Sequence, residues 1–403
     1  MTISQTMVTT PTVTTTGTLK RNVSDQIRRL NPVACPMLAL VKKSGSGKMG
    51  EVSYSSGLIE KEATDTMKFE WFTLTPIDLY NTCSADGNGT TTFLVADSSV
   101  YAARDIVVNT NTLEVGIVVT ASAGTVTVTA VSATFVALKD HVMALACNAH
   151  EEGSSSYTSR TQEPTNNYNF VFPFRFAVSV ADTARNSPHY GENIVARYKK
   201  DNLLFCNRNV ENGLILGNRA ASGDTTSVTI GGTAYAMHTT RGVMDYAAVT
   251  YDAGGTMTYD KWNNDLFQKI PNTMDPEEEI LMFCGKIPWT SAQGWVQSKF
   301  GYWAESGSEI EVFGKRAKKF MCGSYTITLI LHDLMNHGGL AITTLLFNAR
   351  DFKYRYKTGL DIQPKNAIQN PSVWGQTDEI RGVIGLQCWS GGANVLKIIN
   401  WNN

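Results

Sequence analysis

Residues 83–150 place the strongest constraint on the fold, because they carry almost no charge and follow the pattern of β-strands. Only seven of these 68 residues are charged. The runs 113–117 and 125–129 alternate with a period of two, which is the spacing of side chains on one face of a strand. Gly, Asn and Asp separate the runs, as turns require. The sequence therefore predicts a small antiparallel barrel or sandwich, inserted as a β-module.

The sequence before and after this module has a different character. Residues 1 to about 20 are rich in Thr, Val and Ser without a periodic apolar pattern, so we expect an extended arm that orders only against a partner. Apolar residues near helical spacing follow within 22–40, and Pro32 and Pro36 are expected to break that helix. Residues 151–167 are polar and small, which is typical of an exit linker.

The longest predicted helix runs from about 192 to 216. Its 25 or so residues would make a rod of roughly 37 Å at 1.5 Å per residue. Gly217 follows, and we expect it to adopt the left-handed conformation just past the helix end. The apolar residues of this segment do not form one narrow stripe, which is typical of a helix contacted on more than one side.

The rest of the chain predicts a mixture of helices and strands, so the fold class is α+β. The predicted elements are strands at 68–74 and 170–176, a hairpin at 226–235, a helix at 259–270, a strand at 280–284, a helix at 290–300, strands near 309–313 and 325–331, and strand-like sequence over the last 25 residues.

Charge and composition narrow the choice of partner. Charged residues make up 18% of the chain, below the usual quarter, which suits a surface that packs against copies of itself. An ordinary β-rich soluble protein fits the composition equally well. The formal net charge is −1, so contact with nucleic acid would be local and weak, because gripping DNA takes clustered Lys and Arg.

Cysteine usage and hydropathy bear on the compartment. The seven cysteines form no Cys-x-x-Cys pair, and their odd number favours free thiols in a reducing cytoplasm. No apolar run approaches the roughly 20 residues that span a bilayer, so no membrane partner is expected. The first residues lack the charged and apolar regions of a secretion signal.

Catalytic motifs are absent from the sequence. Gly47-Lys48 fails as a phosphate-binding loop because Met49 stands where Ser or Thr would hold magnesium and Lys42 where the first Gly should be. No Gly-x-Ser-x-Gly occurs, and His332 and His337 lack the metalloprotease pattern, so both are expected to be ordinary surface or core residues. We therefore expect no enzyme, cofactor or metal site, with an unrecognised hydrolase as a minor alternative.

One basic cluster remains open to two interpretations. It is a solvated strand edge or turn, or it is an inter-subunit or DNA-facing patch. Its members are Lys315, Arg316, Lys318 and Lys319.

Two passages resemble the major head proteins of tailed bacteriophages typified by phage SU-ten. In that family an Asp-x-Ile … Pro … Pro-Leu-Leu phrase precedes a Phe-Glu-Trp strand. The matching residues here are Asp25-Gln26-Ile27, Pro32, Pro36-Met37-Leu38 and Phe69-Glu70-Trp71. The family also reads Val-Ser-Gly-Thr-Ala-Arg, Tyr-Gly, a helix closing Asp-Ile-Glu … Leu-Leu-Gly, and Arg-x-x-Gly-Leu. This chain is similar at 178–185, at Tyr190-Gly191, at 209–217 and at 239–243, although Ala181-Asp182 replaces the family's Gly and Asn209 its Asp.

The resemblance implies the Hong Kong 97 capsid fold, with parts assigned by analogy. An N-terminal arm would occupy 1–50, an E-loop region 51–172 including the β-module at about 83–150, a P-domain 173–242, an A-domain 243–375, and a return to the P-domain 376–403. The P-domain would hold the spine helix at about 192–216, with Arg197, Lys200, Arg208 and Glu211 as candidate residues. Phe69, Glu70 and Trp71 would lie on an E-loop strand.

The function implied is that of a major capsid protein. Copies would form hexamers and pentamers of an icosahedral head, assembled in the bacterial cytoplasm and carried in the virion. Its partners would be itself, a portal, a separate scaffolding protein, possibly a decoration protein, and packaged double-stranded DNA through weak non-specific contact. The alternative is another virion or surface β-protein (a tail tube, decoration protein or adhesin), and a tube or adhesin should lack the helix at 192–216.

Overall fold

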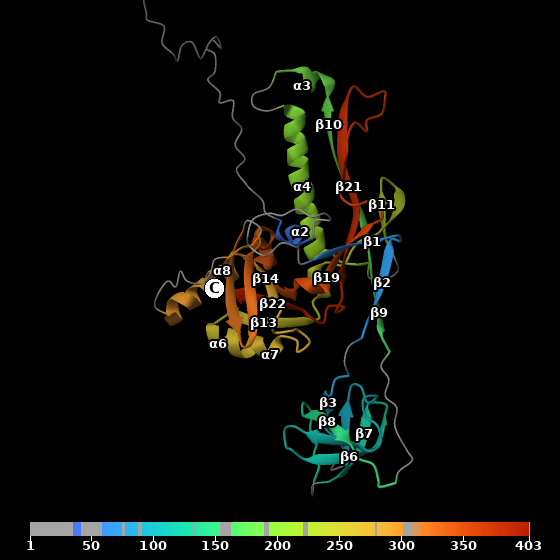
Figure 1. Ribbon diagram of the computed structural model, residues 1–403, viewed down its shortest axis with the longest axis vertical. Coiled ribbons are helices and arrows are strands. Elements are labelled where there is room, and N and C mark those ends of the chain that lie inside the picture. Colours follow the sequence, from blue (N-terminus) through green and yellow to red (C-terminus); the bar gives the residue numbers. More distant parts are fainter. Residues whose placement is uncertain are drawn as a thin grey trace, which may run out of the picture. The chain divides into compact units, whose positions relative to one another are not determined.

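The chain forms two compact units in a computed structural model (Figure 1). The structure describes residues 35–41, 59–74, 77–87, 91–131, 134–153, 163–188, 193–220, 225–278, 280–300, 310–312 and 315–402, with the backbone alone at 296–300, 310–312 and 315–316. We call Phe72–Asn166 the barrel unit, and the described residues of Met1–Trp71 and Asn167–Asn403 the body.

The barrel unit is a closed antiparallel barrel. Its strand order is β3-β4-β7-β6-β5-β8. The strands are β3 (Tyr80–Ala85), β4 (Thr92–Val95), β5 (Asp105–Asn109), β6 (Val115–Ser122), β7 (Thr125–Ala130) and β8 (Val142–Asn148). Alternate residues point into a core that includes the fully buried Phe93, Val126 and Phe135. The predicted β-module is confirmed, and closure leaves none of its strands with an open edge.

A five-stranded sheet forms one half of the body. The order is β1-β19-β21-β10, and β20 also pairs with β21. The strands are β1 (Glu60–Thr64), β10 (Phe172–Ala181), β19 (Phe352–Lys357), β20 (Gln363–Lys365) and β21 (Gly375–Cys388). The long helix α4 (Ile194–Leu216) lies along β10 and β21 (Figure 1). Phe172 of β10 packs so close to α4 that a Cβ at Gly213 would lie 3.2 Å from its ring.

Helix α4 confirms the predicted rod, but its end differs from the expectation. The Asn193 side chain caps the start by accepting hydrogen bonds from the Val195 and Ala196 N–H groups. Gly217 has φ −55° and ψ 145°, so the predicted left-handed conformation is wrong. Glycine fits there for another reason, because a Cβ would lie 2.3 Å from the Gly213 carbonyl oxygen and 2.7 Å from that of Thr240.

A seven-stranded mixed sheet forms the other half of the body, in the order β13-β22-β18-β14-β17-β16-β15. The strands are β13 (Val249–Thr256), β14 (Ile280–Cys284), β15 (Ile310–Val312), β16 (Lys315–Cys322), β17 (Tyr325–Leu331), β18 (Thr344–Asn348) and β22 (Val395–Asn402). All five residues of β14 are buried, as expected of a strand covered on both faces. Trp262, Trp295 and Trp401 pack ring against ring in the core beside this sheet.

Apart from α8, the other elements are short. They are α2 (Pro36–Leu40), β2 (Lys68–Thr73), β9 (Thr165–Phe170), α3 (Asp182–Asn186), β11 (Thr226–Ile230), β12 (Thr233–Met237), α5 (Val243–Tyr246), α6 (Tyr259–Lys261), the π-helix η1 (Trp262–Leu266), α7 (Phe267–Lys269), α8 (Lys286–Phe300), and the 3-10 helices η2 (Asp333–Asn336), η3 (Gly338–Ile342) and η4 (Ala349–Asp351). The sequence placed a helix break at Pro36, yet α2 begins there, because proline needs no N–H partner in a first helical turn. The helix expected before Pro32 lies outside the described residues.

Two pairings cross the predicted domain limits. Strand β19 comes from within 243–375 but pairs with β21 in the five-stranded sheet. Strand β22 comes from within 376–403 but pairs with β13 and β18 in the seven-stranded sheet. The α+β class is confirmed, whereas the domain ranges stay a prediction.

Candidate assembly interface

A buried carboxylate joins three distant parts of the body. Glu211 lies on α4 with its side chain fully buried. Its carboxylate accepts hydrogen bonds from the Met37 N–H at 2.7 Å and the Leu38 N–H at 2.9 Å. These are two of the N–H groups that α2 cannot satisfy internally, and negative charge is favoured at a helix N-terminus. Glu211 therefore fixes α2 to the long helix.

His332, just beyond β17, completes this group, which we call the Glu211 cluster (Met37, Leu38, Glu211 and His332). Its Nε2 lies 2.9 Å from a Glu211 carboxylate oxygen, and its Nδ1 accepts a hydrogen bond from the Leu334 N–H at 3.3 Å. With Nδ1 accepting, Nε2 carries the hydrogen and donates it to the carboxylate. The cluster thus ties α2, α4 and the seven-stranded sheet together without leaving its polar atoms unpaired.

Sequence reasoning singled out Glu211 only as a member of the long helix, and took His332 for an ordinary surface or core residue. The structure places His332 in the core and beside Glu211. One feature of the sequence could have indicated a buried carboxylate. Glu211 lies between the apolar residues Val210 and Leu214, on the side of the helix that faces the core.

The predicted E-loop strand residues lie on β2. Phe69 and Trp71 are buried, whereas Glu70 points outward and pairs with Lys68 at 2.7 Å. Strand β2 pairs with β9, so the chain enters and leaves the barrel unit through one two-stranded ladder. Directly after Trp71, the Phe72 side chain is exposed over 65% of its surface.

The candidate residues of the long helix lie on two sides of it. Glu211 faces the core, whereas Arg197, Lys200 and Arg208 lie away from it. The Arg197 guanidinium stacks on Tyr198, 5.1 Å from the centre of the ring. Beside them, a shallow groove runs between α4 and β10. It is lined by Val178, Ser179, Tyr198, Asp201, Asn202 and Phe205.

The basic cluster lies on β16, one strand in from the edge strand β15. Lys318 is half-buried with its ammonium 5.4 Å from the centre of the Trp289 ring, and Lys319 is exposed. For Lys315 and Arg316 the structure describes only the backbone. Both interpretations of this cluster stay predictions.

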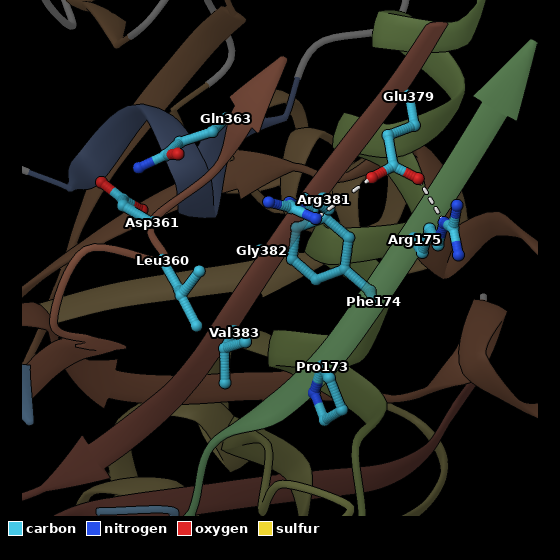
Figure 2. A pocket seen from close by; sticks show the side chains of 10 residues that line it. All are labelled: Pro173, Phe174, Arg175, Leu360, Asp361, Gln363, Glu379, Arg381, Gly382 and Val383. Atoms are coloured by element: carbon cyan, nitrogen blue, oxygen red, sulfur yellow. Dashed lines mark hydrogen bonds and ion pairs between the residues drawn. The ribbon is translucent and has the colours of Figure 1, made fainter. Parts of the chain in front are cut away.

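A pocket of about 400 Å³ opens on the five-stranded sheet (Figure 2). Glu379, whose side chain is 2% exposed, lies between two guanidinium groups, pairing with Arg175 and, at 3.5 Å, with Arg381. Two positive charges around one carboxylate leave this end of the pocket positive, while Phe174 and Val383 give it apolar walls. The remaining lining residues are Pro173, Leu360, Asp361, Gln363 and Gly382.

Ion pairs continue across the same sheet. Glu62 of β1 pairs with Lys353 at 3.0 Å and with Arg355 at 2.6 Å. Partial burial opposes ionisation of Glu62, but the hydrogen bonds from Lys353 and Arg355 outweigh it and lower the pKa of the carboxyl group. Asp378 likewise has a lowered pKa, because hydrogen bonds including one from Lys199 outweigh burial. The carboxyl groups of Glu62 and Asp378 are therefore ionised at neutral pH.

The hairpin of β11 and β12 exposes all ten of its strand residues. The register places Thr226, Val228 and Ile230 on one face, opposite Met237, Tyr235 and Thr233. No residue from 226 to 237 is charged. A two-stranded hairpin with an exposed apolar face is only marginally stable by itself, so this face suits a protein partner.

All seven cysteines are free. Burial raises the pKa of the Cys206 thiol to about 11 and raises that of Cys284 further, so neither is a reactive thiolate at neutral pH. Cys147 is the exposed one.

Within the described ranges, no group of three or more His, Cys, Asp or Glu side chains is arranged to hold a metal ion. In that same part of the chain, no helix is both long and apolar enough to cross a membrane.

Comparison with solved structures finds distant capsid and encapsulin chains. The capsid of Myoviridae Phage XM1 aligns at 10% identity over 98% of this chain and 99% of that one, with a TM-score of 0.44. The capsid of a native GTA particle aligns at 9% identity over 95% of each chain, also at 0.44. The holo-SrpI encapsulin complex of Synechococcus elongatus PCC 7942 aligns at 10% identity over 60% of this chain and 77% of that one, at 0.39. A search of curated protein sequences finds no match.

The family comparison covers nearly the whole chain. The model of the SU10 major capsid protein family matches residues 5–368. The long helix beside a sheet and the separate mixed sheet are parts that the Hong Kong 97 capsid fold predicts for such a chain, and the barrel is the inserted module that the sequence pattern predicted. This protein belongs to the SU10 major capsid protein family, and its role is to form the capsid of a virion.

Proposed function

We propose that this chain assembles into hexamers and pentamers that close into the icosahedral head around phage double-stranded DNA. The family match over residues 5–368 carries the proposal. Helix α4 supports it against the alternative of a tail tube or adhesin, since an all-β protein of either kind has no place for a helix of 23 residues. The role is structural, and we propose no enzymatic activity, metal or cofactor.

We propose that the chain keeps the domain plan of this fold. The arm is residues 1–50, of which the structure describes only 35–41; residues 51–172 form the E-loop region, 173–242 and 376–403 the P-domain, and 243–375 the A-domain. Helix α4, packed on β10 and β21, supports the P-domain assignment. Strand β22 is the exception within 376–403, because its pairing with β13 and β18 joins it to the sheet that holds most of the A-domain strands.

Copies of the chain would cover surfaces that one copy leaves exposed. These are the apolar face of the β11–β12 hairpin, the groove beside α4, the pocket around Glu379 and the exposed Phe72. Each contact can be weak, because many act together once a shell has closed. The basic residues of β16 and the outward residues of α4 belong to the same set of candidate contacts.

Other partners follow from the function. A portal, a separate scaffolding protein and possibly a decoration protein would act with the shell. Packaged DNA would make only weak, non-specific contact, because the chain's net charge of −1 provides little phosphate neutralisation. Assembly would take place in the cytoplasm of the bacterial host.

The test is assembly itself. The chain is expressed alone and with a candidate scaffolding protein, and the products are examined by negative-stain microscopy and sedimentation. We expect capsomers or closed shells. Stable monomers under both conditions would contradict the proposal.

A matched pair of variants tests the hairpin as a contact. Tyr235→Asp places a charge on its apolar face, whereas Thr229→Asp places one on the opposite face. Both positions are exposed, so neither change should unfold the monomer. We expect Tyr235→Asp to reduce shell yield and Thr229→Asp to leave it unchanged. Equal yields from the two variants would remove the hairpin from the set of contacts.

A further inference from the structure

Strand β1 joins the five-stranded sheet without burying any of its side chains. Its sequence is Glu-Lys-Glu-Ala-Thr, and each of these five side chains is exposed or half-buried. Its neighbours differ, because β10, β19 and β21 each contain at least one buried residue. Burial of apolar surface is the main force that holds most strands in a sheet. Other interactions must therefore hold β1 in place.

Ion pairs supply the contacts on one face of β1. Side chains alternate along a strand, so Glu60 and Glu62 lie on the same face. The register places Glu60 opposite Lys353 and Glu62 opposite Arg355. The Glu62 carboxylate pairs with Lys353 at 3.0 Å and with Arg355 at 2.6 Å, and Glu60 pairs with Lys353 at 3.4 Å. Opposite charges thus match position by position along this face.

A charged residue also supplies the contacts on the other face. The Lys61 ammonium pairs with Asp361 at 2.9 Å and lies 5.1 Å from the centre of the Tyr354 ring. The Tyr354 hydroxyl donates a hydrogen bond to the same carboxylate of Asp361 at 3.0 Å. Strand β1 is therefore held by charge on both of its faces, in addition to its backbone ladder with β19.

The interactions that hold β1 are weak ones. Water reaches the ion pairs, since 11% of the Arg355 side chain and 54% of the Glu60 side chain are exposed. Such pairs stabilise a fold only slightly and are screened by salt. As the end strand of its sheet, β1 has a ladder on one side only, and that ladder is parallel, which is slightly less stable per residue than an antiparallel one. Opening of β1 should therefore cost far less than unfolding of the body.

The residues on either side of β1 are anchored more firmly. Ile59, directly before the strand, is fully buried, and its N–H donates to the Leu40 carbonyl oxygen at 3.0 Å. Beyond the strand, the Met67 carbonyl oxygen accepts a hydrogen bond from the Val171 N–H at 2.9 Å, and Phe69 is buried. The segment between these two anchors can open and close again while its ends stay in place.

We propose that β1 is a strand that ionic strength releases from the edge of β19 while the rest of the body stays folded. Low salt keeps it paired through Glu60, Lys61 and Glu62, and high salt opens it. Release uncovers the edge of β19, whose backbone N–H and C=O groups then become available to another strand.

Hydrogen–deuterium exchange of the unassembled full chain tests the proposal, so the result does not depend on shell formation. Peptides that cover β1 and β21 are compared at two sodium chloride concentrations. We expect exchange in β1 to become faster by at least about threefold from about 0.1 M to about 1 M salt, because the Debye length falls from about 10 Å to about 3 Å. Exchange in β21, which holds most of the buried residues of this sheet, should not change.

A matched pair of variants separates the ion pairs from general effects of salt. Glu62→Gln keeps the size of the side chain but removes the charge that faces Lys353 and Arg355. Glu70→Gln removes the same charge from an exposed position on β2. We expect β1 in Glu62→Gln to exchange at low salt about as fast as in the unaltered chain at high salt, and β1 in Glu70→Gln to behave as in the unaltered chain.

Three results would overturn the proposal. The first is exchange in β1 that does not respond to salt. The second is a loss of protection that β21 shares, because the whole body would then be unfolding. The third is equal exchange of β1 in Glu62→Gln and Glu70→Gln, because the pairs of Glu62 would then not hold the strand.

Discussion

Removing the Glu211 carboxylate should destabilise the body more than any surface change. Glu211→Ala leaves the Met37 and Leu38 N–H groups and the His332 Nε2–H without their acceptor, in a place that water does not reach. An unsatisfied buried donor costs about 1–3 kcal/mol, and this change leaves three of them. Because α2 is short and can detach to rehydrate its N–H groups, we expect a total loss of about 3–5 kcal/mol, toward the lower end of the summed cost of three donors.

The assay is denaturant-induced unfolding of the unassembled chain, with Glu211→Gln and Glu277→Ala beside it. The amide of Glu211→Gln keeps one acceptor oxygen, so its loss should be smaller, about 1–3 kcal/mol. Glu277 is exposed, and its substitution should change stability by no more than about 0.5 kcal/mol. Protease cleavage near α2 should accelerate for Glu211→Ala alone, since that change frees the segment. If Glu211→Ala unfolds at the same denaturant concentration as Glu277→Ala, the cluster does not hold these parts together.

Three further predictions concern the core, one helix end and pH. Phe93→Ala in the barrel unit should cost about 3–5 kcal/mol, measured as the loss of protease resistance of residues 72–166, because Phe93 is fully buried; unchanged resistance would contradict the packing described. Gly217→Ala should destabilise the body, because its Cβ would meet two carbonyl oxygens. Gly294 in α8 has open space around it, so Gly294→Ala should leave the stability unchanged or raise it by up to about 1 kcal/mol. Thermal unfolding of both variants measures the difference. Glu62 and Asp378 have lowered pKa values in the folded state, so their stabilising effect is present above their unfolded pKa values and is lost as pH falls through the folded ones. Unfolding midpoints at neutral and acidic pH should therefore differ less in Glu62→Gln than in the unaltered chain.

Much of the fold follows from local patterns. The alternation in 113–117 and 125–129 predicted strands of a small barrel or sandwich, and the structure shows a barrel. The apolar residues of 192–216 predicted α4 to within two residues of its observed start. Both patterns repeat over short distances, where side-chain spacing and backbone geometry are directly linked. The family resemblance, carried by short motifs in order, predicted the capsid role that the family match confirmed.

For the candidate contacts, too, the sequence indicated a general property and the structure decided the positions. Composition indicated a chain with little surface charge, but the exposed faces of the β11–β12 hairpin and the pocket around Glu379 depend on which strands pair and which side chains remain uncovered.

The sequence by itself determined the kinds of elements and their order, because hydrophobic period, turn residues and helix caps act over a few residues. Only the tertiary structure decided that Glu211 meets Met37 across 174 positions and His332 across 121. It also decided why position 217 must be glycine, and that the last strand joins the seven-stranded sheet. These outcomes depend on which surfaces meet when the whole chain packs at once, and that choice is a property of the complete core rather than of any segment.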